Sequence, residues 1–214
     1  MLKVIAVQEH TIREPIKVLK ILTKSLKTEC EVFRLNILLF NGGTSNKNTK
    51  LVVNIFKSLC ESKGHTVFYL DSYYHDCINC RKCASTGECC IKDDITGVFK
   101  NNGIDIIIIG TPLYFFYMSA KAKAFLDRLY SINLRDKILG LICVSGSPYY
   151  ESGTPLVEES IVNSCDYCKS HYGGTFHMVT NDEYTGYLTE EDKEGLKNFL
   201  CDLEVTYSEI KEDK

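Results

Sequence analysis

Residues 104–109 read IDIIII, and this run decides the fold class. A strand made almost entirely of isoleucine has no polar face, so it must be buried on both sides, as strands are within a parallel sheet. Helical patterns separate this run from its neighbours, and such alternation is typical of parallel strands joined by crossover helices. Four further runs have the composition of strands: residues 36–40 (NILLF), 65–71 (HTVFYLD), 137–144 (KILGLICV) and 175–180 (TFHMVT).

The helices between these strands have recognisable ends. Thr154 is expected to cap a helix with Pro155 at its first position, and Thr189 with Asp192 forms the capping-box pattern of a closing helix. We therefore expect an α/β fold, with a doubly wound, five-stranded parallel sheet of strand order 2-1-3-4-5. The helix expected after Ser119 has an apolar stripe of Ala122, Phe125, Leu126 and Leu129.

Residues 1–35 precede the first of these strands. Residues 2–7 have the pattern of a short strand, and residues 15–27 that of a helix with one apolar side. We interpret residues 1–35 as an N-terminal strand and helix added to a domain of residues 36–214. An addition of this kind is suited to covering a sheet edge or an oligomer contact.

Composition disfavours several classes of protein. The 214 residues are 44% hydrophobic and 25% charged, with a formal net charge of -3, and the lysines are scattered rather than gathered on one stripe. No apolar run approaches the ~18 residues that span a bilayer. We therefore expect neither a membrane nor a nucleic acid as partner. The chain starts without a long apolar signal region and has 11 cysteines, an odd number, so a reducing cytoplasm is the expected location.

Four cysteines form the run Cys77-x2-Cys80-x2-Cys83-x5-Cys89. Thiolates are soft anionic donors, and a loop this short can fold all four around one point. We therefore expect an iron–sulfur cluster in a loop of residues 77–90. Zinc is the competing occupant, although structural zinc sites usually take two Cys-x2-4-Cys pairs separated by a longer spacer.

The remaining cysteines are expected to be packed thiols. Cys90 adjoins Cys89 but has the less suitable spacing for a ligand. Cys165 and Cys168 would share one helix face, where core packing is favoured over a second metal or redox site. His75 is interpreted as a solvated loop residue. Four further cysteines lie in apolar patterns that predict burial: Cys30, Cys60, Cys143 and Cys201.

The loop after the first strand has the composition of a phosphate site. Doubly wound sheets bind ligands at the carboxyl ends of strands where the strand order reverses, here between the first and third strands. The glycines of this loop let backbone amides approach a ligand, and the helix N-terminus that follows favours an anion. An ordinary polar turn is the alternative, and the loop lacks the Walker and G-x-G-x-x-G motifs. It consists of Asn41, Gly42, Gly43, Thr44, Ser45, Asn46, Lys47, Asn48 and Thr49.

The loop expected after the third strand reads GTPLYFFY at residues 110–117. Its four aromatic side chains follow a buried strand and cannot all point into the core, so some are expected to flank a flat ligand. Aromatic faces stacked on an isoalloxazine ring, with backbone amides at its polar edge, are what a flavin site requires. The two loops together therefore favour a flavin.

These residues resemble a known family, the flavodoxin-fold NAD(P)H-dependent FMN reductases, and within it the iron–sulfur flavoproteins. The matching motifs are residues 41–49, residues 110–115 with Ser119-Ala120 and Leu126-Asp127-Arg128, and the cysteine run closed by Ile91-Lys92-Asp93-Asp94. The resemblance covers roughly residues 36–180. It implies a flavodoxin-like fold, a homodimer or homotetramer, FMN bound by residues 41–49 and by Pro112, Leu113, Tyr114 and Phe115, and a 4Fe-4S cluster on Cys77, Cys80, Cys83 and Cys89.

The sequence departs from this family in three places. Gly42-Gly43-Thr44 stands where the family commonly has Ser-Pro-Arg, so the loop lacks a cation that would pair with the phosphate. Ser145 and Gly146 match the third loop of the family only loosely, and their contact with the flavin follows from the resemblance. Residues 1–35 have no counterpart. The polar residues that would compensate for the missing cation are Thr44, Ser45, Asn46, Asn48 and Thr49.

The predicted function is that of an FMN-dependent oxidoreductase that moves electrons between a reduced donor, FMN and a 4Fe-4S cluster. Such a pair of centres converts electron-pair transfer into single-electron transfer. Arg81, Lys82 and Lys92 are expected to offset the charge of the cluster. NAD(P)H and ferredoxin are both candidate donors. The alternatives are a cluster-free NAD(P)H-dependent flavin or quinone reductase, and a non-enzymatic electron carrier or zinc-stabilised binding module.

Overall fold

A computed structural model of the chain describes residues 33–43, 47–72, 74–101, 103–180 and 186–212. The N-terminal strand and helix expected at residues 2–7 and 15–27 fall outside this part, as do Cys30, Thr44, Ser45 and Asn46. The account below concerns the unit that begins at Arg34.

The described residues contain five parallel strands, whose order β2-β1-β3-β5-β6 confirms the predicted 2-1-3-4-5 arrangement. A further short strand, β4 (Tyr117–Met118), pairs antiparallel with the end of β3. The parallel strands are β1 (Asn36–Asn41), β2 (Thr66–Leu70), β3 (Ile106–Tyr114), β5 (Ile138–Ser145) and β6 (His171–Val179).

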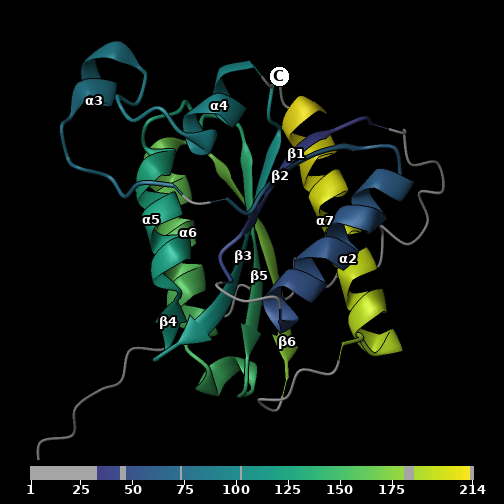
Figure 1. Cartoon of the computed structure of the whole chain (residues 1–214). Helices are drawn as coiled ribbons and strands as arrows, with labels where there is room; N and C mark the ends of the chain where they lie inside the picture. Colours follow the sequence, from purple (N-terminus) through teal and green to yellow (C-terminus); the bar gives the residue numbers. More distant parts are fainter. Residues whose placement is uncertain (1–32, 44–46, 73, 102, 181–185, 213–214) are drawn as a thin grey trace, which may run out of the picture. The chain divides into compact units, whose positions relative to one another are not determined.

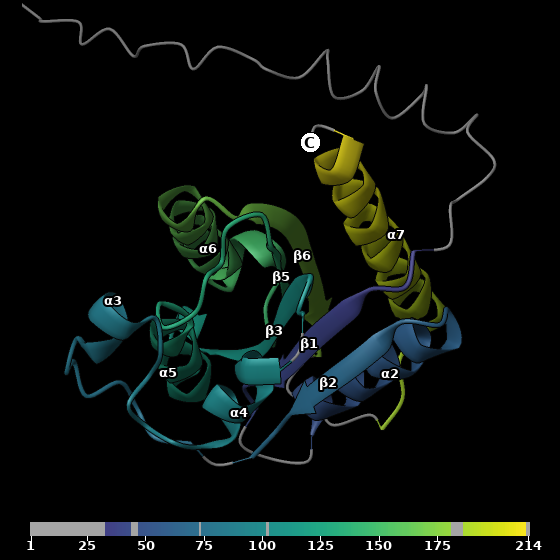
Figure 2. The same cartoon turned by 90° about the horizontal axis from the view of Figure 1, so that it is seen from above.

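Helices cover both faces of this sheet (Figures 1 and 2). α2 (Asn48–Ser62) and α7 (Glu190–Glu212) lie on one face, and α5 (Ala120–Leu129) and α6 (Thr154–Cys168) lie on the other. None of the helices in the described ranges is long and apolar enough to cross a membrane. The shorter elements are α3 (Lys82–Thr86), α4 (Asp94–Asn101) and the 3-10 turn η1 (Tyr149–Glu151).

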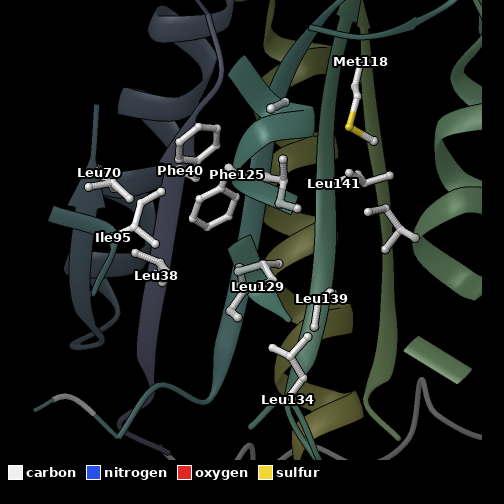
Figure 3. Packing of buried hydrophobic residues seen from close by; sticks show 14 of the residues in the cluster. Leu38, Phe40, Leu70, Ile95, Met118, Phe125, Leu129, Leu134, Leu139 and Leu141 are labelled. Carbon is white, nitrogen blue, oxygen red and sulfur yellow. The ribbon is translucent and has the colours of Figure 1, made fainter. Parts of the chain in front are cut away.

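The main core lies between the sheet and the α5–α6 layer (Figure 3). Phe40 of β1 and Phe125 of α5 stack there with ring centroids 4.0 Å apart and planes 4° from parallel. Ile107 and Ile109 of β3 point to the same side, whereas Ile106 and Ile108 point to the opposite face, and all four are fully buried. The isoleucine run is therefore buried on both sides, as its composition predicts.

Two strands differ by more than two residues from the sequence prediction. β3 does not end at Ile109 but continues to Tyr114, because β5 pairs with it as far as Pro112 and β4 pairs with its last two residues. β6 begins at His171 rather than at residue 175. Two glycines, Gly173 and Gly174, lie in its first half beside a register shift, and glycine removes the side-chain pattern by which a strand is recognised.

The helix ends follow the predicted capping with one correction. Ser119 caps α5 by accepting from the Ala122 N–H, and the Thr189 hydroxyl accepts from the Asp192 N–H at 3.1 Å before α7. Thr154, in contrast, is the first helical residue of α6, and Gly153 is the cap with a φ of 86°. A side chain at position 153 would collide with the Phe116 carbonyl, so glycine is required there.

Most of the packed cysteines are placed as predicted. Cys60 and Cys143 are buried, and burial raises the pKa of each thiol to about 12. Cys165 is buried against the sheet, and Cys168, one turn later, is half-buried. The prediction for Cys201 is wrong, because the buried stripe of α7 passes through Leu200 and Leu203 and leaves Cys201 exposed.

The Phe40–Phe125 stack gives a test of this core. Phe125→Ala removes a fully buried ring and leaves a cavity, so we expect the free energy of unfolding to fall by about 3–5 kcal/mol. Phe115→Ala is the matched control, since that ring is exposed and its loss should change the value by less than about 0.5 kcal/mol. Denaturant unfolding followed by circular dichroism measures both. Equal effects of the two substitutions would contradict this packing.

Candidate functional site

The loop after β1 and the end of β3 are in direct contact. Asn41 and Gly110 are parallel neighbours in the sheet, and the Gly42 N–H donates to the Gly110 carbonyl at 2.7 Å. A Cβ atom at Gly42 would lie 2.7 Å from that carbonyl oxygen and 2.9 Å from the Ala122 Cβ, so only glycine fits this approach. The two segments that the sequence singles out as ligand-binding therefore meet at one edge of the sheet.

Ser119 fixes this contact from the start of α5. Its hydroxyl donates to the Gly42 carbonyl at 2.8 Å, and its N–H donates to the Thr111 hydroxyl at 3.0 Å. Ser119 and Thr111 are both buried, so water does not compete for these bonds. The residue that caps α5 thus also positions both loops.

The loop after β1, which the sequence predicts to hold a phosphate, leads into the N-terminus of α2. The Gly43 N–H donates to Asn41 Oδ1 at 3.0 Å, which turns the chain after β1, and Thr49 is buried in the first turn of α2. This first turn contains no acidic residue, so the partial positive charge of the helix end is not offset by a carboxylate in that turn. The geometry suits an anion.

Two lysines surround Asp71 beside this loop. Lys50 Nζ of α2 lies 2.9 Å from one carboxylate oxygen, and Lys121 Nζ of α5 lies 3.1 Å from the other. Burial opposes ionisation of Asp71, but hydrogen bonds from Lys50 and Lys121 outweigh it and hold the pKa of the carboxyl below its usual value. Lys121 Nζ also lies 3.5 Å from the Gly43 carbonyl oxygen. Two lysines on one carboxylate leave net positive charge beside a loop whose sequence lacks the expected arginine.

The hairpin between β3 and β4 presents aromatic side chains to solvent. Tyr114, Phe115 and Phe116 are 55%, 96% and 59% exposed. Phe115 and Phe116 have positive φ values of 51° and 66°, which cost about 1–3 kcal/mol each for residues of this size. Phe115 and Phe116 are the two residues between the paired Tyr114 and Tyr117, and a hairpin turn of this length requires positive φ at both of its central residues. Of the four residues predicted to contact the ring, Pro112 is buried and Leu113 half-buried, so Tyr114 and Phe115 are the two whose side chains are open to a ligand.

In the third loop predicted to contact the flavin, at Ser145 and Gly146, the Ser145 hydroxyl is already engaged within the protein, so only the backbone is left for a ligand. Ser145 ends β5, and its buried Oγ donates to the Ser147 carbonyl at 2.7 Å and lies 2.8 Å from His177 Nε2. Burial lowers the pKa of His177. Because the Ser145 hydroxyl already donates its proton to Ser147, His177 Nε2–H is the donor in the contact with Ser145. Gly146 is exposed beside it.

Five cysteines of the cysteine loop line one small cavity. The hydrogen-bonded pair Cys80 and Cys90 has its sulfur atoms 3.1 Å apart, so Cys90 belongs to this group and is not packed elsewhere. In the part of the chain that the structure describes, no three Cys, His, Asp or Glu side chains lie close enough together to hold a metal ion. The cavity, of about 40 Å³, is lined by Cys77, Cys80, Cys83, Cys89 and Cys90 together with Arg128 and neighbouring residues.

Arg128 connects this loop to α5. Its guanidinium pairs with the Asp93 carboxylate through contacts of 2.9 and 3.0 Å, and the two side chains are only 1% and 8% exposed. Burial disfavours the charge on Arg128, but the hydrogen bonds and charge of Asp93, and then Cys89, outweigh it and raise the pKa of Arg128. In the sequence, Arg128 and Asp93 belong to two different family motifs. The pairing of their side chains could not be predicted, because the two residues lie 35 positions apart.

A groove of about 450 Å³ runs along α5 between the two sites. At one end it is lined by Lys121, which lies beside the loop after β1. At the other end it is lined by Cys77 and Asp127, on the side of the cysteine loop. α5 runs from beside β4 toward the level of α3 and α4 (Figure 1). Since α5 has ten residues, it separates the two sites by a rigid rod about 15 Å long.

The sequence matches known oxidoreductases. Residues 35–172 match the model of the NADPH-dependent FMN reductases. An iron–sulfur flavoprotein of Methanocaldococcus jannaschii is 31% identical over 142 residues, which cover 59% of this chain and 74% of that protein. An iron–sulfur flavoprotein of Archaeoglobus fulgidus is 29% identical over 121 residues, which cover 52% of this chain and 60% of that protein.

Solved structures share the fold at lower sequence identity. The flavodoxin of Streptococcus pneumoniae TIGR4 aligns with a TM-score of 0.54 and 18% identity over 80% of this chain and 98% of its own. The NAD(P)H:quinone oxidoreductase of Methanothermobacter marburgensis aligns with a TM-score of 0.55 and 15% identity over 81% of this chain and 98% of its own. Because the family match spans most of a flavodoxin-like sheet and both loops at its edge, the chain belongs to the NADPH-dependent FMN reductase family and is an FMN-dependent oxidoreductase.

Proposed function

We propose that this oxidoreductase binds FMN where the loop after β1 meets the end of β3, and that its cysteine loop holds a 4Fe-4S cluster. The observation that supports the FMN site most strongly is the hydrogen bond from Gly42 to Gly110, which brings an amide-rich loop and an aromatic hairpin to one edge of the sheet. When bound, FMN accepts an electron pair and releases single electrons, and a cluster transfers one electron at a time.

The residues at this edge suit the two ends of FMN. The N-terminus of α2 and the net positive charge around Asp71 favour the phosphate, and Tyr114 and Phe115 would flank the ring. Ser145 and Gly146 would meet the ring through their backbone. The residues that would hold the phosphate are Asn41, Gly42, Gly43, Thr44, Asn46, Asn48 and Thr49.

The cysteine loop suits a cluster by its chemistry and by its freedom to adjust. Cys77, Cys80, Cys83 and Cys89 are the proposed ligands, and all four line one cavity. α3, which lies among them, has no buried residue, so the loop can close around four irons without opening the core. The names of the curated relatives point the same way.

The electron partners follow from this pair of centres. A reduced nicotinamide is the proposed two-electron donor, because an exposed flavin face needs few dedicated residues to receive it. A small molecule or a protein such as ferredoxin would exchange single electrons with the cluster. A homodimer or homotetramer is the proposed assembly.

A cluster-free flavin or quinone reductase is the second candidate. It would need only the two loops that meet at the edge of the sheet through the bond from Gly42 to Gly110. The cysteine loop would then contain free thiols or zinc. A non-enzymatic electron carrier or a zinc-stabilised module is the third candidate and would need no nicotinamide.

Purification without oxygen tests the cluster. We expect about four irons and one FMN per chain, with flavin absorption bands and a broad brown shoulder beside them. Cys83→Ser should remove the iron, because it deletes a thiolate ligand, and should leave the flavin in place. Cys201→Ser is the matched control, since that exposed cysteine lies on α7 and its loss should keep the iron. Flavin without iron in the parent protein would establish the second candidate, and neither cofactor would leave the third.

The flavin loop has a separate test. Gly42→Ala places a methyl group against the Gly110 carbonyl and Ala122, so the loop must shift and FMN should bind at least about tenfold more weakly, or ~1.4 kcal/mol. Gly97→Ala on α4 meets nothing within 4 Å and serves as the control. Quenching of flavin fluorescence on titration gives both dissociation constants. Unchanged affinity in Gly42→Ala would rule out this position for FMN.

A further inference from the structure

One guanidinium ties together the two ends of the cysteine loop. Arg128 Nη1 donates to the His75 carbonyl at 2.6 Å, and the same guanidinium forms the two bonds to Asp93 described above. The His75 N–H donates to the Asp93 carboxylate at 3.2 Å. His75 precedes all five cysteines of the loop and Asp93 follows them. These bonds therefore close the loop at its base.

Arg128 also faces the cavity that the cysteines line. It is one of the lining residues, and its Nε is buried without a hydrogen-bond partner among the described residues. Buried donors nearly always have an acceptor, so Nε–H is placed to donate to a group held in this cavity. An anionic sulfur of a liganded cluster is an acceptor of the right chemistry, and Cys89 lies beside the guanidinium.

The other cations of the loop differ from Arg128 in their exposure. Arg81 also lines the cavity, but Arg81, Lys82 and Lys92 are all exposed, and Lys92 lies 3.9 Å from the Glu88 carboxylate. Water and salt screen exposed charges, whereas a buried charge acts across a medium of lower dielectric constant. Arg128 is therefore better placed than these three residues to act on a cluster.

We propose that Arg128 is a positioning residue for the cluster: it holds the cysteine loop closed in its ligating arrangement, and the charged Nε–H of its buried guanidinium, which Asp93 does not occupy, stabilises the anionic cluster, most of all when reduced. This inference rests on the proposed function. Partners of this kind orient the ligands of a metal centre and raise its potential. Loop closure and charge are separable, because different substitutions remove them.

The experiment uses anaerobically reconstituted protein with four substitutions. Arg128→Gln removes both the bidentate guanidinium and its charge. We therefore expect about tenfold greater loss of iron to a chelator and a lower midpoint potential of the cluster in redox titration. Arg128→Lys keeps a positive charge but cannot form the bidentate bonds to Asp93, so iron loss should rise while the midpoint potential stays nearer that of the parent protein. Asp93→Asn loosens the base of the loop with Arg128 retained and should also raise iron loss. Lys92→Gln should change the midpoint less than Arg128→Gln.

The outcomes separate this inference from the proposed function. Parental iron retention and midpoint in Arg128→Gln would overturn the inference, and so would an equal midpoint shift in Lys92→Gln. FMN content reports whether each variant is folded, and if Arg128→Gln does not fold, Arg128→Lys and Asp93→Asn decide: parental iron retention in both would reject the role. A parent protein that takes up no cluster would instead overturn the proposed function.

Discussion

The hydrogen bond from Gly42 to Gly110 is the contact on which the site depends. β1 and β3 are paired in parallel up to Asn41 and Gly110. The two backbone segments can then approach closely, because neither Gly42 nor Gly110 has a side chain. A Cβ at Gly110 would lie 2.4 Å from the Val53 side chain of α2, so the same glycine lets α2 pack closely on the sheet. The close approach of two backbones thus places a helix N-terminus and an aromatic hairpin beside one another.

α5 joins this edge of the sheet to the cysteine loop. Ser119, just before the first turn of α5, donates a hydrogen bond to Gly42. Arg128, in the last turn of α5, pairs with Asp93. Between these two residues, Phe125 packs on Phe40. Breaking a buried ion pair by removing one partner typically costs about 3–5 kcal/mol, because the other charge remains buried. α5 is therefore fixed at both ends, and its length sets the spacing between the two proposed cofactor sites.

Much of this arrangement follows from local sequence patterns. The strands, their order and the approach of the two loops depend on periodicity and on the rules for parallel connections, which a single sequence displays. The cluster of Lys50, Asp71 and Lys121, and the pairing of Arg128 with Asp93, could not be predicted in this way, since each joins distant elements. A lysine or arginine on a helix has the pattern of a surface residue until the fold shows what it faces.

A crystal structure of the anaerobically purified protein with FMN tests the arrangement most directly. We expect the phosphate within hydrogen-bonding distance of the backbone amides of the loop at residues 41–49, and the ring against Tyr114. FMN bound elsewhere, with its phosphate away from Gly42 and Gly43, would contradict the placement of the flavin at the contact between β1 and β3.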